Sequence, residues 1–321
     1  MSFASNARAE MARELCAEKC CSRAELAAAL LASGGISYRF GREVGYALSI
    51  TAAEAAVVRH YFQLLKRHFG VTAQIRTLRS NSLSGMTRYQ LVIPEEDSML
   101  LLREAGLYDP DAPFGLRAVP PDALLNYACC KKAFLKSAFM VCGGMSNPEI
   151  AYHIEIAAPS EDFADCVIKN LNYYEIGAKK ACRKAKYVVY LKKSDDVSDM
   201  LTLMGASQSV LALQNVRIKK DVSNRVNRQV NCDSSNINRV METALKQIED
   251  IRYIEQEIGL EKLPLPLRDI AEARMNNAAT SLAGLGEMLE PPIGKSGVNA
   301  RLRRISEIAQ KLRCGEEIEL K

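Results

Sequence analysis

Two segments about a hundred residues apart share one plan: a helix rich in small residues that stops at a pair of glycines. The first is Ala24–Ile36, which stops at Gly34-Gly35, and the second is Lys131–Met145, which stops at Gly143-Gly144. Because small side chains let helices approach closely, each segment is expected to pack against a near partner. Two such helices indicate an internal duplication whose halves meet along them. Two unrelated alanine-rich core helices would give the same local pattern.

The segments that follow the two helices favour duplication. Apolar periodicity predicts the order helix, strand, strand, helix, strand, strand, helix in both repeats, at about 22–106 and 131–204. In the first repeat, strands are predicted at 36–40, 44–50, 71–78 and 87–93, and helices at 51–68, capped by Thr51, and at 95–105. In the second repeat, three of the four strands are located, at 151–157, 175–182 and 186–192, and helices are predicted at 160–171 and 194–204.

Composition narrows the class of protein. A chain of 321 residues with 48% hydrophobic content is long enough for two or three packed domains. Its net charge of +5 permits a polyanionic partner without requiring one. No apolar run is long enough to span a membrane, and the charged N-terminus does not resemble a signal peptide, so a cytoplasmic protein is expected.

The cysteines do not predict a metal site. Ten cysteines are too sparse for a disulfide scaffold in a chain of this length. Cys16, Cys20 and Cys21 form a tight cluster in the sequence, and no histidine lies at a zinc-binding spacing from it. We therefore expect neither a metal nor a cofactor.

Residues 206–258 lose the strand pattern and are expected to form a helical linker. Its middle, Asn224–Asp233, is rich in asparagine, a residue type whose side chain competes for backbone hydrogen bonds. A helix break near 231–235 is predicted there. The segment fits either a solvated connector or a partner-binding element.

The C-terminal segment, 259–321, has the layout of a helix-turn-helix domain. One helix is predicted at 265–275, a second is marked by Leu282, Leu285 and Leu289, and Pro291-Pro292 ends it. Ser296 is expected to cap a third helix, whose predicted apolar residues are Val298, Leu302, Ile305, Ala309 and Leu312.

The opposite side of the third helix is basic. In a helix-turn-helix the second helix of the pair enters the major groove, and arginine pairs well with guanine or phosphate. The predicted DNA contacts are Lys295, Ser296, Asn299, Arg301, Arg303 and Arg304. A three-helix bundle with a solvated basic face would show the same charges.

Several separate stretches resemble the bacterial WhiA family of regulators, and the resemblance extends over almost the full length. The stretches that carry it are Lys132–Lys136, Asn227–Asp233, Gln247–Ile251, Leu285–Leu289 and Lys295–Arg303. The resemblance implies an α+β fold: a duplicated αββαββα domain at 1–205, similar to LAGLIDADG homing endonucleases, joined by the helical linker to an all-α helix-turn-helix domain.

The endonuclease likeness also implies two acid positions, one near the end of each small-residue helix. In active relatives these acids hold the divalent metals that cut DNA. Alignment of the motifs places Ser33 and Cys142 there, and neither side chain supplies a hard anionic oxygen. No single substitute among Glu25, Glu149, Glu155 and Glu161 has the required position on both helices. The chain is therefore not expected to be an enzyme.

The expected function is sequence-specific binding of double-stranded DNA by a non-catalytic transcriptional regulator on the nucleoid. The resemblance links it to sporulation or to cell division and chromosome segregation. The alternative is an adaptor whose N-terminal domain binds the transcription machinery, with a sigma factor or another regulator as partner. The predicted strands mix acids with bases, which indicates a weakened ancestral DNA surface; the residues are Glu43, Glu155, Glu175, Arg39, Arg76, Arg88 and Lys186.

Overall fold

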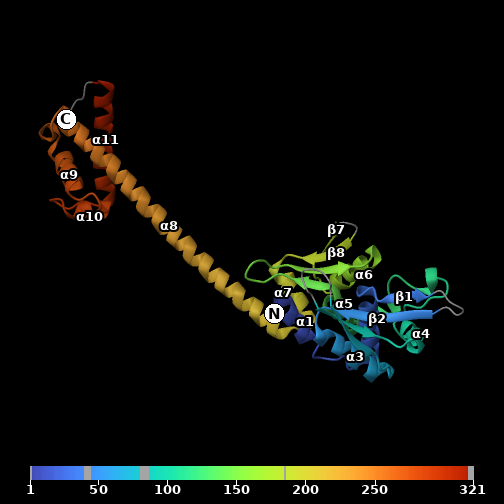
Figure 1. The fold of residues 1–321 in the computed structure, drawn as a ribbon. Helices are drawn as coiled ribbons and strands as arrows, with labels where there is room; N and C mark the ends of the chain where they lie inside the picture. Colours follow the sequence, from blue (N-terminus) through green and yellow to red (C-terminus); the bar gives the residue numbers. More distant parts are fainter. Residues whose placement is uncertain (1, 40–44, 80–86, 184–185, 317–321) are drawn as a thin grey trace. The chain divides into compact units, whose positions relative to one another are not determined.

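The computed structural model describes residues 2–39, 45–79, 87–183 and 186–316 (Figure 1). The connections between the predicted strands of the first repeat, at 41–43 and 80–85, lie outside the described residues, and Glu43 is among them. The chain divides into two compact units, Met1–Lys219 and Lys220–Lys321. Each unit is described by itself.

The N-terminal unit contains two αββαββα repeats, so the predicted duplication is confirmed. After α1 (Phe3–Met11), the first repeat comprises α2 (Lys19–Ala32), β1 (Ile36–Arg39), β2 (Gly45–Ala52), α3 (Ala55–Phe69), β3 (Gln74–Arg79), β4 (Thr87–Val92) and α4 (Glu95–Glu104). The second comprises α5 (Ala128–Cys142), β5 (Gly143–Met145), β6 (Ile154–Ala158), α6 (Glu161–Asn172), β7 (Lys179–Arg183), β8 (Lys186–Leu191) and α7 (Ser194–Leu203).

Each repeat has a four-stranded antiparallel sheet, and the two sheets have the same topology. The strand orders are β1-β2-β4-β3 and β5-β6-β8-β7. Strand β2 alternates between buried and half-buried residues, with Leu48, Ile50 and Ala52 on the core side. In the second sheet, Ile154 and Ile156 of β6 are buried. Each sheet therefore covers the core with one face only.

Three sequence predictions for this unit are wrong. Thr51 does not cap α3, because it pairs with Gln90 inside β2, and Glu54 precedes the helix instead. The glycine pair after α5 does not merely stop the helix; it enters β5, where Gly143 pairs with Ile156. Glu175 lies in a left-handed turn with φ 58°, so the predicted strand begins only at Lys179.

Helices α2 and α5 pack closely together in the core of the unit. Ala24, Ala27 and Ala28 of α2 are fully buried, as is Ala138 of α5. A hydrogen bond crosses between the helices, from the Ser137 hydroxyl to the backbone oxygen of Glu25 at 2.6 Å. The small-residue helices are thus the interface between the repeats.

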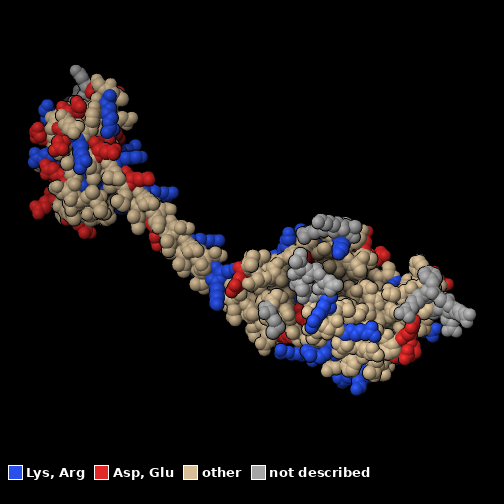
Figure 2. Space-filling model, viewed as in Figure 1, with Lys and Arg blue, Asp and Glu red and all other residues tan. Residues whose placement is uncertain are grey.

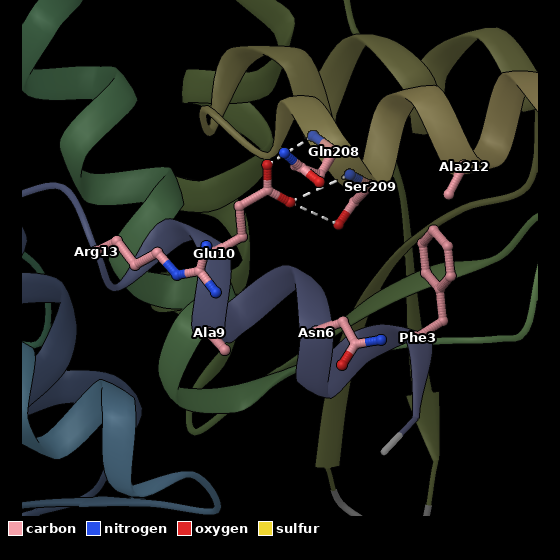
Figure 3. Close-up of a pocket in the computed structure, with 8 residues that line it drawn as sticks. All are labelled: Phe3, Asn6, Ala9, Glu10, Arg13, Gln208, Ser209 and Ala212. Carbon is pink, nitrogen blue, oxygen red and sulfur yellow. Dashed lines mark hydrogen bonds between the residues drawn. The ribbon is translucent and has the colours of Figure 1, made fainter.

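Helix α8 (Ser207–Glu257) is continuous, so the predicted break near 231–235 is wrong. Within this stretch the Gln229 amide donates to the Asp233 carboxylate at 3.2 Å. These polar side chains therefore pair with each other along the helix and do not compete for its backbone hydrogen bonds. The start of α8 is held by Glu10 of α1, whose carboxylate accepts from the backbone N–H groups of Gln208 and Ser209 (Figure 3). An acid at a helix N-terminus satisfies free donors and complements the helix dipole.

The C-terminal unit has a separate core. It contains η3 (Leu260–Lys262), α9 (Leu265–Asn276), α10 (Leu282–Glu287) and α11 (Lys295–Cys314). Ile251 and Ile254, from the end of α8, are fully buried in this core together with Ile270, Leu285 and Leu302.

Within the described residues, no helix is both long enough and apolar enough to cross a membrane.

Candidate nucleic-acid interface

Helix α10 is positioned by polar contacts made by the loop before it. Ser281 caps the helix, since its hydroxyl accepts from the N–H of Gly284 at 3.2 Å. The buried guanidinium of Arg274 donates to the Gln247 side chain at 3.0 Å and to the Thr280 backbone oxygen at 2.8 Å. Burial lowers the pKa of Arg274, and neutral oxygens satisfy its donors. This arrangement fixes the loop that leads into α10.

The turn between α10 and α11 depends on Gly286. A Cβ atom at this position would lie 2.1 Å from the backbone oxygen of Ile293 and 3.2 Å from a methyl group of Val298. The N–H of Ile293 donates to the Gly286 oxygen at 3.0 Å. Only a residue without a side chain lets α10 and the start of α11 approach this closely.

Helix α11 has one buried and one exposed side, as predicted. Val298, Leu302, Ile305 and Ala309 are nearly or fully buried. The predicted cap is wrong, because Gly294 occupies the cap position and Ser296 lies in the first turn. The first turn has no side-chain cap, so its N–H groups face outward as they do in many phosphate sites.

Lys295, Ser296 and Asn299 lie together at the start of α11. With Leu282 of α10 they line a shallow hollow, and all three polar side chains are exposed. At 100° per residue, Lys295, Asn299 and Arg303 lie on one face, with Ser296 beside them. One ammonium, one amide, one hydroxyl and one guanidinium therefore point to the same side, where they can contact phosphate oxygens and base edges.

The remaining predicted arginines do not lie on that face together. Arg301 is half-buried on the side of α9 and donates to the Pro266 backbone oxygen at 3.4 Å. Arg304 is exposed and pairs with Glu307 at 3.3 Å, and Arg303 pairs with the same carboxylate at 3.5 Å. Exposed pairs of this kind contribute little stability, so a phosphate can replace Glu307.

Basic and acidic side chains are interspersed over the C-terminal unit (Figure 2). Arg313 pairs with Asp250 at 2.9 Å, and Arg268 with Glu272 at 3.5 Å. Electrostatic attraction to DNA is therefore local to a few positions on α11 rather than spread over the whole unit.

A second polar surface is the face of the first sheet that does not cover the core. Register and alternation place Gln74, Arg76, Arg88 and Gln90 on this face. Strand β3 is exposed along its whole length. On the corresponding face of the second sheet, Glu155 lies 3.5 Å from His153, which reduces the positive potential there.

Ser33 and Cys142, which the family resemblance aligns with the metal-binding acids, are engaged with backbone oxygens. The Ser33 hydroxyl lies 3.2 Å from the Ser49 oxygen and 3.3 Å from the Leu30 oxygen, and the Cys142 thiol donates to the Ala138 oxygen at 3.1 Å. Burial raises the pKa of Cys142 to about 12, so this thiol stays protonated at neutral pH. Arg8 donates to the backbone oxygen of Gly143 and pairs with the Glu54 carboxylate at 2.7 Å, so the positive charge next to Cys142 is matched by a negative one.

Of the proposed substitute acids, Glu25 is already paired inside the core. It accepts from His60 and from the Cys16 thiol, and it is fully buried. Glu161 is on the outer side of α6, where it binds Lys180. Neither carboxylate is available at the end of a small-residue helix.

Comparison with known proteins gives the family. The probable cell division protein WhiA of Desulforamulus reducens is 39% identical over 318 residues, which cover 99% of this chain and 98% of that protein. The protein of the same name from Clostridium botulinum is 38% identical over 317 residues, covering 98% of this chain and 100% of that protein. The chain belongs to the WhiA family.

Three family profiles match consecutive parts of the chain. The WhiA N-terminal LAGLIDADG-like domain matches 19–108, the WhiA LAGLIDADG-like domain matches 131–223, and the WhiA C-terminal HTH domain matches 226–309. The crystal structure of full-length DUF199/WhiA from Thermatoga maritima matches 97% of this chain and 99% of that one, with 21% identity and a TM-score of 0.56. The predicted fold class is confirmed.

Sequence reasoning missed the residues that hold the WhiA-type helix-turn-helix in shape. Arg274 and Gly286 received no role from the sequence, although each contributes to the geometry around α10. Gly286 lies inside one of the stretches that resemble the WhiA family, and a glycine there could have indicated that the backbone needs a residue without a side chain. No feature of the sequence indicates that Arg274 is buried, since an arginine in an amphipathic helix is normally exposed.

Proposed function

We propose that this WhiA-family protein is a non-catalytic, sequence-specific DNA-binding transcriptional regulator, linked to sporulation or to cell division and chromosome segregation. It acts in the cytoplasm on the nucleoid. Residues 1–205 serve as the LAGLIDADG-like domain, 206–258 as the helical linker and 259–321 as the DNA-binding domain. The observation that carries the proposal is the polar cluster at the start of α11, on a helix whose other side is locked in the core.

Lys295, Ser296, Asn299 and Arg303 supply the main contacts, and Arg304 contacts the backbone from the flank. Arg301 contributes through its position beside α9, or rotates out to reach a phosphate. In the helix-turn-helix binding mode, residues near the N-terminus of the second helix reach base edges, which is where the hollow lies. The uncapped first turn provides additional donors for a phosphate oxygen.

The experiment is selection of bound sequences from a random double-stranded library by the full chain, followed by titration of the enriched site. The Asn299→Ala variant removes a base-reading amide, whereas Lys311→Ala removes a charge from the far end of the same helix. If Asn299→Ala and Lys295→Ala bind the enriched site like the wild type, α11 does not read the DNA.

Absence of nuclease activity is the second part of the proposal. It is supported by the chemistry of the former acid positions: a hydroxyl and a protonated thiol are poor ligands for Mg²⁺. The LAGLIDADG-like fold then serves as a structural platform.

An adaptor role remains the alternative, and one feature of the N-terminal unit favours it. A hollow lies between α1 and the first turns of α8 (Figure 3). Its lining includes Phe3, Asn6, Arg13 and Ala212, together with Glu10 and its partners Gln208 and Ser209. A sigma factor or another regulator bound there would give the unit a function without DNA. Binding of the enriched site by residues 1–205 alone, with steep salt dependence, would instead indicate that the open sheet faces still bind DNA.

A further inference from the structure

Two pairs of adjacent cysteines converge where the two central helices begin. Cys20 and Cys21 lie in the first turn of α2, and Cys129 and Cys130 in the first turn of α5. The sulfur atoms of all four lie within 4.8 Å of one another. The sequence shows only two separate dipeptides 109 positions apart, and the duplication brings them to equivalent places.

The spacing of the sulfurs suits one metal ion. The distance is 4.0 Å within each pair, from Cys20 to Cys21 and from Cys129 to Cys130. A tetrahedral zinc ion with Zn–S bonds of about 2.3 Å separates its sulfurs by about 3.8 Å. Each sulfur therefore needs to move inward by roughly half an ångström to bind zinc. An iron–sulfur cluster places several metal atoms between its thiolates and needs them farther apart.

The surroundings suit a thiolate site. Both pairs lie at helix N-termini without a side-chain cap, where free N–H groups and the helix dipole favour negative charge. Cys130 and Cys21 are buried, whereas Cys129 is exposed. A hollow lined by Cys21, Cys129 and Lys132 gives an ion access from solvent, and the lysine adds positive charge beside the thiolates.

We propose that Cys20, Cys21, Cys129 and Cys130 form a structural site for a single zinc ion that joins the two repeats. Zinc takes the four sulfurs as thiolates, so binding releases their four protons to solvent and leaves a complex of net charge 2−. Four protein ligands close the coordination sphere, which is the pattern of structural zinc sites. The ion ties the first turn of α2 to the first turn of α5, and so fixes the repeat interface at the end opposite Ser33 and Cys142.

The test uses the full chain, purified under reducing conditions and reconstituted with zinc chloride or cobalt chloride. We expect about one tightly held zinc ion per chain by mass spectrometry of the metal, and with cobalt the strong visible absorption of a tetrahedral tetrathiolate. Chelation is expected to lower the melting temperature of the N-terminal unit, because the bound metal stabilises only the folded state.

Variants separate this site from other thiols. Cys129→Ser changes an exposed side chain and leaves folding intact; it is expected to weaken binding and to shift the cobalt spectrum toward a site with three sulfurs. The matched control, Cys182→Ser, removes an exposed cysteine outside the cluster and is expected to behave like the wild type. Cys130→Ser, which changes a buried cysteine of the cluster, is expected to abolish zinc binding.

Two results would overturn the proposal. One is the absence of stoichiometric metal from the reconstituted wild-type chain, or metal binding by Cys129→Ser that equals the binding by the wild type. The other is a metal-free protein whose mass shows that the four thiols have formed disulfides that reductant reverses, because the cluster would then be a redox site.

Discussion

The Nε2 atom of His60 lies 2.6 Å from the carboxylate Oε1 of Glu25, and both side chains are buried. The other ring nitrogen, Nδ1, lies 3.0 Å from the backbone oxygen of Ala12. A carbonyl oxygen only accepts, so Nδ1 carries a proton. Nε2 faces the Glu25 carboxylate, and the Lys136 ammonium lies 4.0 Å from the same carboxylate oxygen.

This pair predicts a specific acid sensitivity. Burial is the largest single influence and acts to raise the pKa of Glu25. The hydrogen bond and charge interaction with His60, the charge of Lys136 and the hydrogen bond from Cys16 together lower the pKa below the ordinary value of 4.5. A lowered pKa means that the charged carboxylate stabilises the fold above pH 4.5, and that this contribution is lost as pH falls through the lower, folded-state pKa. Glu25→Gln is expected to cost about 3–5 kcal/mol at pH 7, as breaking a buried pair does.

Calorimetric scans of the full chain between pH 7 and pH 3 check this prediction. The wild type is expected to lose stability more steeply than Glu25→Gln in the acid range. Glu96→Gln, which changes an exposed glutamate, is the control. Equal melting temperatures for Glu25→Gln and the wild type at pH 7 would show that the Glu25–His60 pair does not stabilise the N-terminal unit.

The start of α11 predicts two different effects on DNA binding. Asn299→Ala is expected to weaken binding to the preferred sequence by about 1–3 kcal/mol and to relax specificity at one base pair. Lys295→Ala is expected to weaken binding to all sequences alike and to reduce the salt slope by about one, since a lysine near a helix start contacts phosphate. Fluorescence anisotropy at several salt concentrations, with specific and random duplexes, distinguishes the two.

The close approach at Gly286 predicts a large effect of one methyl group. Gly286→Ala brings Cβ to 2.1 Å from the Ile293 oxygen, so the backbone must move. We expect a loss of about 1–3 kcal/mol in the C-terminal unit, a typical cost of overpacking, together with weaker DNA binding. In Gly297→Ala the nearest atom lies 3.5 Å away, so this helical position is expected to gain stability. Thermal unfolding followed by circular dichroism tests both, and equal losses would contradict the steric argument.

The former acid positions predict that no Mg²⁺-dependent strand cleavage occurs at the preferred DNA site. Plasmid and oligonucleotide substrates, incubated with the full chain and Mg²⁺ or Mn²⁺, are expected to remain intact. Specific cleavage that disappears in Ser33→Ala or Cys142→Ala would show that the centre has kept catalytic chemistry.

Local pattern was sufficient for most of the secondary structure. The spacing of Leu302, Ile305 and Ala309 predicted their burial, because apolar residues on one side of a helix must be covered. Local pattern failed at Thr51 and at Asn231–Ser235. A strand partner overrode the capping preference of Thr51, and continuous backbone hydrogen bonding overrode the weak helix propensity of the asparagines.

The sequence by itself determined the duplication and the basic side of the last helix, because small-residue periodicity and charge spacing are properties of neighbours along the chain. It could not show that Arg301 lies beside α9 while Lys295, Ser296 and Asn299 share a hollow, since these depend on which neighbouring helix covers each side of α11. Nor could it bring together Cys20, Cys21, Cys129 and Cys130. The packing of α2 against α5 sets the distance between the two cysteine pairs, because tertiary packing brings together residues that are remote in sequence.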